Sequence, residues 1–135
     1  MKSHYHCVYD LKYHLVIVTK YRRKCFTGKI VERLNEICAE LCQKWEIDLI
    51  EFGGEADHIH LLLEMNPTIQ ISKFVNNLKT VTSRYIRKEF AEHLAEYYWE
   101  RVLWTRAYYI STVGGAPLTT VKKYIENQER PKAKS

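Results

Sequence analysis

The sequence predicts an α+β fold with one antiparallel sheet, because two amphipathic helical patterns alternate with four short strand patterns in a regular order. The 135 residues suffice for one domain with one hydrophobic core. Apolar residues make up 46% and charged residues 27%, a balance typical of folded soluble chains and not of disordered ones. We therefore expect a single domain over residues 1–135, with its core at about 9–113.

Four strands and two helices account for that core. Apolar and polar residues alternate over residues 11–19, 47–52, 58–65 and 108–113, which predicts four strands. Apolar residues recur every three or four positions over 29–45 and 68–90, which predicts two helices. We expect Thr68 to cap the second helix, Tyr85 to lie on its buried stripe, and Gly53 and Gly54 to form the turn between the second and third strands. The order βαββαβ is the split βαβ pattern of ferredoxin-like folds.

An extra helix is predicted at the C-terminus, over about residues 117–130, where Pro117 suits the first turn. Gly114 and Gly115 come directly before it. Glycine adopts backbone angles closed to other residues, so the pair is either a hinge on which this helix moves or a plain turn after the last strand. Tyr124 and Gln128 stand four residues apart and therefore share one face of the helix.

The cysteines and the apolar runs exclude several classes of protein. The four cysteines match neither a CxxC pair nor a zinc-ribbon spacing, and Cys38 and Cys42 lie one helical turn apart among apolar residues, as small core residues do. The longest apolar run, residues 15–18, is far shorter than the roughly 20 residues that span a bilayer. We expect a cytoplasmic protein with reduced thiols and no membrane partner.

Basic residues exceed acidic residues by 21 to 16, which gives a formal charge of +5 and weakly favours a polyanionic partner. The densest basic cluster includes an aromatic ring, which suits DNA phosphates and a stacked base, although a solvated turn is the plain alternative. This cluster consists of Lys20, Tyr21, Arg22, Arg23 and Lys24. Lys122 and Lys123 precede Tyr124, and we expect them to contact DNA as well.

A histidine pair lies in the third predicted strand. Strand periodicity places His58 and His60 on one face and Ile59 and Leu61 on the other. The helices of such a fold cover the apolar face, so the histidine face stays open and could bind a metal. Two surface histidines that are hydrogen-bonded to neighbours are the alternative. Asp57 either forms the preceding turn or orients a histidine ligand by a hydrogen bond.

Three blocks of the sequence resemble the single-tyrosine HUH transposases of the single-strand insertion-sequence type, which are TnpA-like proteins with REP-associated relatives. The blocks are YDLKYHLVIVTKYRRK, DHIHLLLE and LWTRAYYISTVGGAPLTTVKKYIENQ. The resemblance implies that Tyr124 is the nucleophile, that His58 and His60 bind a divalent metal, and that Gln128 is a third ligand. It also implies cleavage and rejoining of single-stranded DNA near hairpins at element ends, through a covalent 5′-phosphotyrosine, by a homodimer with composite active sites.

The chemistry of these residues agrees with that implication. Two imidazoles and an amide are neutral ligands, so they leave the charge of a Mg²⁺ or Mn²⁺ ion available to a phosphate. A phosphotyrosine link conserves the bond energy for rejoining, so no nucleotide cofactor is expected and no Walker motif occurs. The alternatives are a domesticated HUH nuclease that processes host repeats, a replication or conjugation nickase, and a non-catalytic ferredoxin-like protein that binds nucleic acid.

Overall fold

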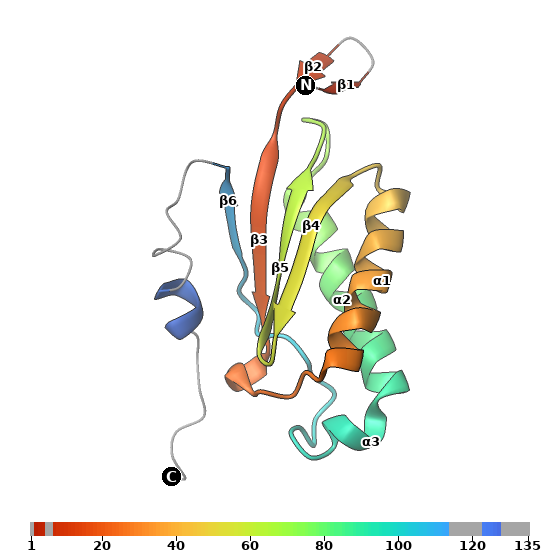
Figure 1. Ribbon diagram of the computed structural model, residues 1–135, viewed down its shortest axis with the longest axis vertical. Coiled ribbons are helices and arrows are strands. Elements are labelled where there is room, and N and C mark those ends of the chain that lie inside the picture. The colour runs from red at the N-terminus through yellow and green to blue at the C-terminus, as the bar shows by residue number, and fades with distance from the viewer. Residues whose placement is uncertain (1, 5–6, 114–122, 128–135) are drawn as a thin grey trace.

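A four-stranded antiparallel sheet with two helices on one face forms the body of the molecule (Figure 1). The computed structural model describes residues 2–4, 7–113 and 123–127. The strands lie in the order β4-β5-β3-β6, and all neighbours are antiparallel. Their bounds are Lys12–Val18 for β3, Asp48–Glu55 for β4, His58–Glu64 for β5 and Tyr109–Thr112 for β6. This topology confirms the predicted ferredoxin-like α+β fold.

The two main helices are α1, Gly28–Lys44, and α2, Ile71–Glu89, and a short α3, Ala91–Leu94, follows them. Thr27 caps α1, where its side chain accepts a hydrogen bond from the backbone N–H of Ile30. The prediction that Thr68 caps α2 is wrong. Asn66 accepts hydrogen bonds from the backbone N–H and the hydroxyl of Thr68, so these residues form a separate turn before the helix. No helix in the described part of the chain is long and apolar enough to cross a membrane.

Two further elements have no periodic pattern in the sequence. A hairpin of β1, Lys2–His4, and β2, Cys7–Tyr9, precedes the sheet, and a 3-10 turn, η1, Lys20–Arg22, follows β3. Strands and turns of three residues are too short to show a hydrophobic period. The 3-10 turn contains the first three residues of the predicted basic cluster, so its backbone sets the directions in which their side chains point.

The register of the sheet separates a buried face from an open one. Leu15 lies opposite Leu61, and Ile17 lies opposite Ile59, with each of these side chains at most 1% exposed beneath the helices. In α2 the buried stripe includes Thr82 in place of the expected Tyr85, which is 40% exposed. Thr82 is accommodated because its hydroxyl donates to the carbonyl of Leu78 and accepts from Trp104 Nε1.

Three buried thiols are expected to resist alkylation in the native protein. Burial raises the pKa of the Cys25 thiol to about 11 and that of Cys42 to about 12, and it also raises the pKa of Cys38. At pH 8, a rise of two pKa units leaves about a hundredfold less thiolate, which is the reactive form. Iodoacetamide labelling of a Cys7→Ser variant should therefore be slow until urea unfolds the chain. Equal labelling rates in the native and unfolded protein would contradict this burial.

A candidate active site on the open face of the sheet

The two histidines of β5 lie on the face of the sheet that the helices leave open. His58 lies opposite Val18 and His60 lies opposite Val16, so both side chains point away from the helices. Their ring centroids are 6.1 Å apart, and the ring planes differ by 36°. Metal–nitrogen bonds of about 2.1 Å place each imidazole centre roughly 3 Å from a shared ion. The separation of the pair is therefore at the upper limit at which two imidazoles can share one metal ion.

Gly53 of β4 provides the space in which the ring of His60 lies. A Cβ atom at Gly53 would come within 2.4 Å of Nε2 and 2.3 Å of Cε1 of His60. A Cβ at Gly54 would come within 2.9 Å of a methyl group of Val31 in α1. The prediction that these glycines form the turn is wrong, because β4 continues through both of them. They are needed for close approach, one on each face of the sheet.

Gly53→Ala is expected to displace the His60 ring, because no real Cβ tolerates contacts this short. We expect divalent-metal affinity to fall by at least about tenfold while the fold persists. Isothermal titration with Mn²⁺ and thermal unfolding measure the two effects. Gly28→Ala is the matched control, since a Cβ there meets no atom within 4 Å. Unchanged Mn²⁺ affinity in Gly53→Ala would show that the position of this ring does not matter for binding.

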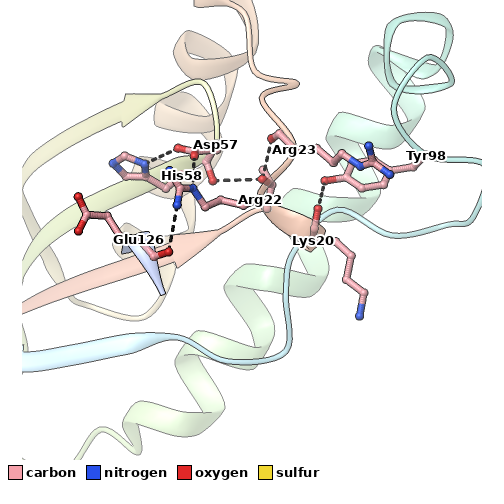
Figure 2. A network of polar contacts seen from close by, with 8 residues as sticks. Lys20, Arg22, Arg23, Asp57, His58, Tyr98 and Glu126 are labelled. Atoms are coloured by element: carbon pink, nitrogen blue, oxygen red, sulfur yellow. Dashed lines mark hydrogen bonds and ion pairs between the residues drawn. The ribbon is translucent and has the colours of Figure 1, made fainter. Parts of the chain in front are cut away.

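Asp57 orients the ring of His58 (Figure 2). Its carboxylate lies 2.8 Å from His58 Nδ1 and accepts a 3.0 Å hydrogen bond from Arg22 Nε. Burial opposes ionisation of this carboxyl, but the bonds from His58 and Arg22 outweigh that effect and lower the pKa of Asp57. A carboxylate at Nδ1 holds the proton on that nitrogen and leaves Nε2 of His58 to face a ligand.

The environment of His60 favours its neutral form. Desolvation of the imidazole against the sheet, together with the nearby His58, lowers the pKa of His60. A lowered pKa means that the ring stays uncharged to a more acidic pH than an ordinary histidine. A neutral imidazole is the form that binds a metal.

Tyr124 lies on the same side of the sheet as the histidines. Residues 123–126 form a helical turn, and the ring of Tyr124 is 5.2 Å from the ring of Tyr109 on the edge strand β6. Tyr109 lies opposite Val16, which in turn lies opposite His60. One row of residues across the sheet therefore runs from the tyrosine contact to the histidine pair. The hydroxyl oxygen of Tyr124 is covered from solvent. The fold therefore brings residues 58, 60 and 124 to one side of the sheet, where the hydroxyl of Tyr124 is covered by protein atoms.

A hydrogen bond ties the tyrosine turn to the histidine turn. Arg22 Nη1 donates to the backbone carbonyl of Glu126 at 3.2 Å, while Nε of the same guanidinium holds Asp57 (Figure 2). Sequence reasoning assigned Arg22 to DNA and did not anticipate this internal role. No local signal indicates it, because Arg22 and Glu126 are 104 residues apart.

Several predicted site residues lie outside the described part of the chain. They are Gly114, Gly115, Lys122 and Gln128, together with most of the helix predicted at 117–130. Lys123 is described and is exposed beside Tyr124. Within residues 2–4, 7–113 and 123–127, no group of three histidine, cysteine or carboxylate side chains could hold a metal ion. A third ligand of another type, such as Gln128, thus stays a prediction.

The basic cluster lies against the turn that carries Asp57. Thr19 donates from its backbone N–H to the carbonyl of Asp57 at 2.9 Å, which joins the end of β3 to that turn. The Tyr21 ring is contacted by Lys20 Nζ at 5.2 Å and by Arg23 Cζ at 5.9 Å from its centroid. Lys24 is exposed. The cluster therefore places positive charge and an aromatic ring close to the histidine pair.

The fold and the site together define an α+β protein with a ferredoxin-like sheet whose open face carries two histidines and a tyrosine beside a basic cluster. Comparison with known families makes the assignment specific. A family model described as "Transposase IS200 like" matches residues 7–128, and the chain belongs to this family.

Individual relatives agree with the family. The chain is 35% identical over 127 residues to the transposase for insertion sequence element IS200 of Salmonella typhimurium, covering 94% of this chain and 82% of the relative. It is 33% identical over 121 residues to the ISDra2 transposase TnpA of Deinococcus radiodurans, covering 90% and 86%.

Two solved structures share the fold. One is a crystal structure of a Deinococcus radiodurans chain assigned as a transposase, with a TM-score of 0.86, 30% identity, and coverage of 97% of this chain and 100% of that one. The other is a REP-associated tyrosine transposase bound to a REP hairpin, with a TM-score of 0.58, 8% identity, and coverage of 93% and 69%. The second supports the fold alone.

Proposed function

We propose that this transposase cleaves and rejoins single-stranded DNA at the ends of an insertion sequence, through a covalent 5′-phosphotyrosine at Tyr124 and with a divalent metal, Mg²⁺ or Mn²⁺. The observation that carries the proposal is the position of His58, His60 and Tyr124 on one open face of the sheet. Packing of the hydrophobic core does not explain why these three side chains share the open face. An enzyme that acts on chromosomal DNA in this way would work in the cytoplasm.

The histidines provide the electrostatic half of the proposed site. His58 and His60 would hold the metal, with Gln128 as the proposed third ligand, and the ion would neutralise a phosphate oxygen and make the phosphorus easier to attack. The Asp57 carboxylate keeps His58 in a fixed orientation. The lowered pKa of His60 keeps its lone pair available near neutral pH. These side chains would therefore orient the reacting phosphate through the ion that they hold.

Tyr124 provides the nucleophile. Its phenolic oxygen would form a bond to the phosphorus of the scissile phosphate while the bond from phosphorus to the 3′ oxygen breaks, so that the DNA keeps a 3′ hydroxyl and the phenol loses its proton. Rejoining reverses these changes when a 3′ hydroxyl attacks the phosphotyrosine. Because the hydroxyl is covered from solvent, the turn of residues 123–126 must shift before DNA reaches it. Gly114 and Gly115 are the proposed hinge for that movement.

Single-stranded DNA with a hairpin is the proposed substrate. The net charge of +5 and the basic cluster beside the histidine turn provide contacts for phosphates, with Lys20, Arg23, Lys24 and Lys123 as the proposed side chains. Tyr21 could stack on an unpaired base. The REP-associated structural neighbour was solved with a REP hairpin, and hairpin DNA is accordingly the first substrate to test.

A homodimer is the proposed assembly, with composite sites that combine the histidine pair of one subunit and the tyrosine helix of the other. In a single chain, Arg22 holds the tyrosine turn beside its own histidines. An exchange between subunits would therefore begin by breaking this tie. Light scattering during size-exclusion chromatography would measure the assembly directly.

The decisive experiment incubates the protein with labelled single-stranded DNA that carries hairpins from the ends of candidate elements, in the presence of Mn²⁺. A protein–DNA adduct that survives denaturing gel electrophoresis is expected, and addition of EDTA should prevent it. The same sequence as a perfect duplex serves as the control and should give no adduct. Cleavage without any protein–DNA adduct would contradict the phosphotyrosine mechanism.

A further inference from the structure

We propose that Arg22 is a positioning residue with two tasks: it stabilises the docked tyrosine turn, and it holds Asp57, the carboxylate that orients the His58 imidazole. This inference rests on the proposed function, because it concerns the two halves of the same site. It assigns Arg22 an internal role that differs from the DNA contact expected from its place in a basic cluster.

The first argument is the number of partners that one guanidinium holds. Arg22 Nε donates to Asp57 at 3.0 Å and Nη1 donates to the Glu126 carbonyl at 3.2 Å, while Asp57 in turn contacts His58 Nδ1 at 2.8 Å (Figure 2). A guanidinium has five N–H donors in a fixed plane, so it can point at two partners in different directions. Lysine, with a single nitrogen, cannot reproduce both contacts at these positions.

The second argument is the backbone that presents this side chain. Tyr21 and Arg22 have φ values of 59° and 56°, in the left-handed region that residues with a side chain rarely adopt. Neighbouring contacts hold this conformation. The Thr19 hydroxyl donates to the carbonyl of Arg23 at 2.7 Å, and the Tyr98 hydroxyl donates to the carbonyl of Lys20 at 2.6 Å. Strained residues held in this way concentrate at functional sites.

The third argument is that the two contacts of Arg22 differ in strength. The Arg22 and Asp57 side chains are 13% and 9% exposed, and their bond joins two charges. The bond to Glu126 is exposed and reaches a neutral carbonyl. The tyrosine turn can therefore leave by breaking the weaker bond, while Asp57 keeps His58 oriented. Arg22 thus stabilises the docked turn without making the orientation of His58 depend on it.

The test compares Arg22→Gln and Arg22→Lys with the wild type in the absence of metal and DNA. Asn127 N–H bonds to the carbonyl of Lys123 within the tyrosine turn, so its hydrogen exchange reports docking. We expect this exchange to accelerate by at least about tenfold in both variants. Nitrogen-15 NMR of the imidazole should show the Nδ1-protonated tautomer of His58 retained in Arg22→Lys, which keeps a cation beside Asp57, and mixed in Arg22→Gln.

The matched control is Arg33→Gln, which removes an arginine that pairs with Glu36 and Glu89 away from the site. In Arg22→Gln, either a wild-type exchange rate at Asn127 or an unchanged His58 tautomer would overturn the proposal. Activity gives a separate readout. In Arg22→Gln we expect kcat to fall roughly 10- to 100-fold at constant KM for DNA. A rise in KM with unchanged exchange would identify Arg22 as a DNA contact instead. If the wild-type protein makes no adduct, the proposed function fails, yet exchange and tautomer still decide the role of Arg22.

Discussion

Replacing Tyr124 by phenylalanine is expected to abolish the covalent protein–DNA adduct and to reduce strand cleavage by at least about a thousandfold. The substitution removes one oxygen atom and keeps the ring that packs at 5.2 Å from Tyr109. The fold and the docking of the turn should therefore persist, and the loss would be chemical. Denaturing gels with labelled DNA measure the adduct, and a gel-shift assay should show that DNA binding remains.

A matched tyrosine separates this effect from a general one. Tyr85 lies on α2, is 40% exposed, and contacts Arg33 and Arg84 on the helical side of the molecule. Tyr85→Phe should cleave like the wild type. Full adduct formation by Tyr124→Phe would assign the nucleophile to another residue, and mass spectrometry of the digested adduct would identify it.

His58→Ala and His60→Ala are expected to have the second largest effect. Each removes one of the two imidazoles whose centroids lie 6.1 Å apart, so the ion loses a ligand and the phosphate loses its electrostatic partner. We expect Mn²⁺ affinity to fall by more than the roughly 10- to 100-fold that loss of an outer hydrogen-bond partner causes. Cleavage should fall in parallel at fixed metal concentration. Titration calorimetry and cleavage assays over a range of Mn²⁺ concentrations measure both.

The control for the histidine variants is His93→Gln. His93 lies in α3, away from the histidine pair, and contacts the carbonyl of Cys25 through Nε2 at 2.7 Å; glutamine can still donate to that carbonyl. This variant should bind Mn²⁺ and cleave normally. If His58→Ala and His60→Ala cleave normally in EDTA, the pair is structural and the proposed metal chemistry is wrong.

Local sequence patterns predicted the parts of the fold that depend on periodicity. Alternation in 58–65 placed the two histidines on one face, and the register with β3 confirms it. Predictions that depended on single residues fared less well. Thr68 was expected to cap a helix, and Gly53 and Gly54 were expected to form a turn, because each residue type favours those positions. In the structure, Thr68 belongs to a turn with Asn66, and Gly53 and Gly54 lie where β4 packs closely against His60 and Val31.

The amino-acid sequence alone was enough to predict the order of the four sheet strands and two main helices, the buried and open faces of the sheet, and the residues through which the chain resembles its family. These features depend on neighbours a few positions apart, so a periodic pattern records them. Three contacts are visible only in the folded chain: Arg22 joins Asp57 to Glu126, Gly53 lies beneath His60, and Tyr124 packs on Tyr109. Each of these contacts joins strands or turns distant in the chain, and their geometry depends on how the whole sheet is paired.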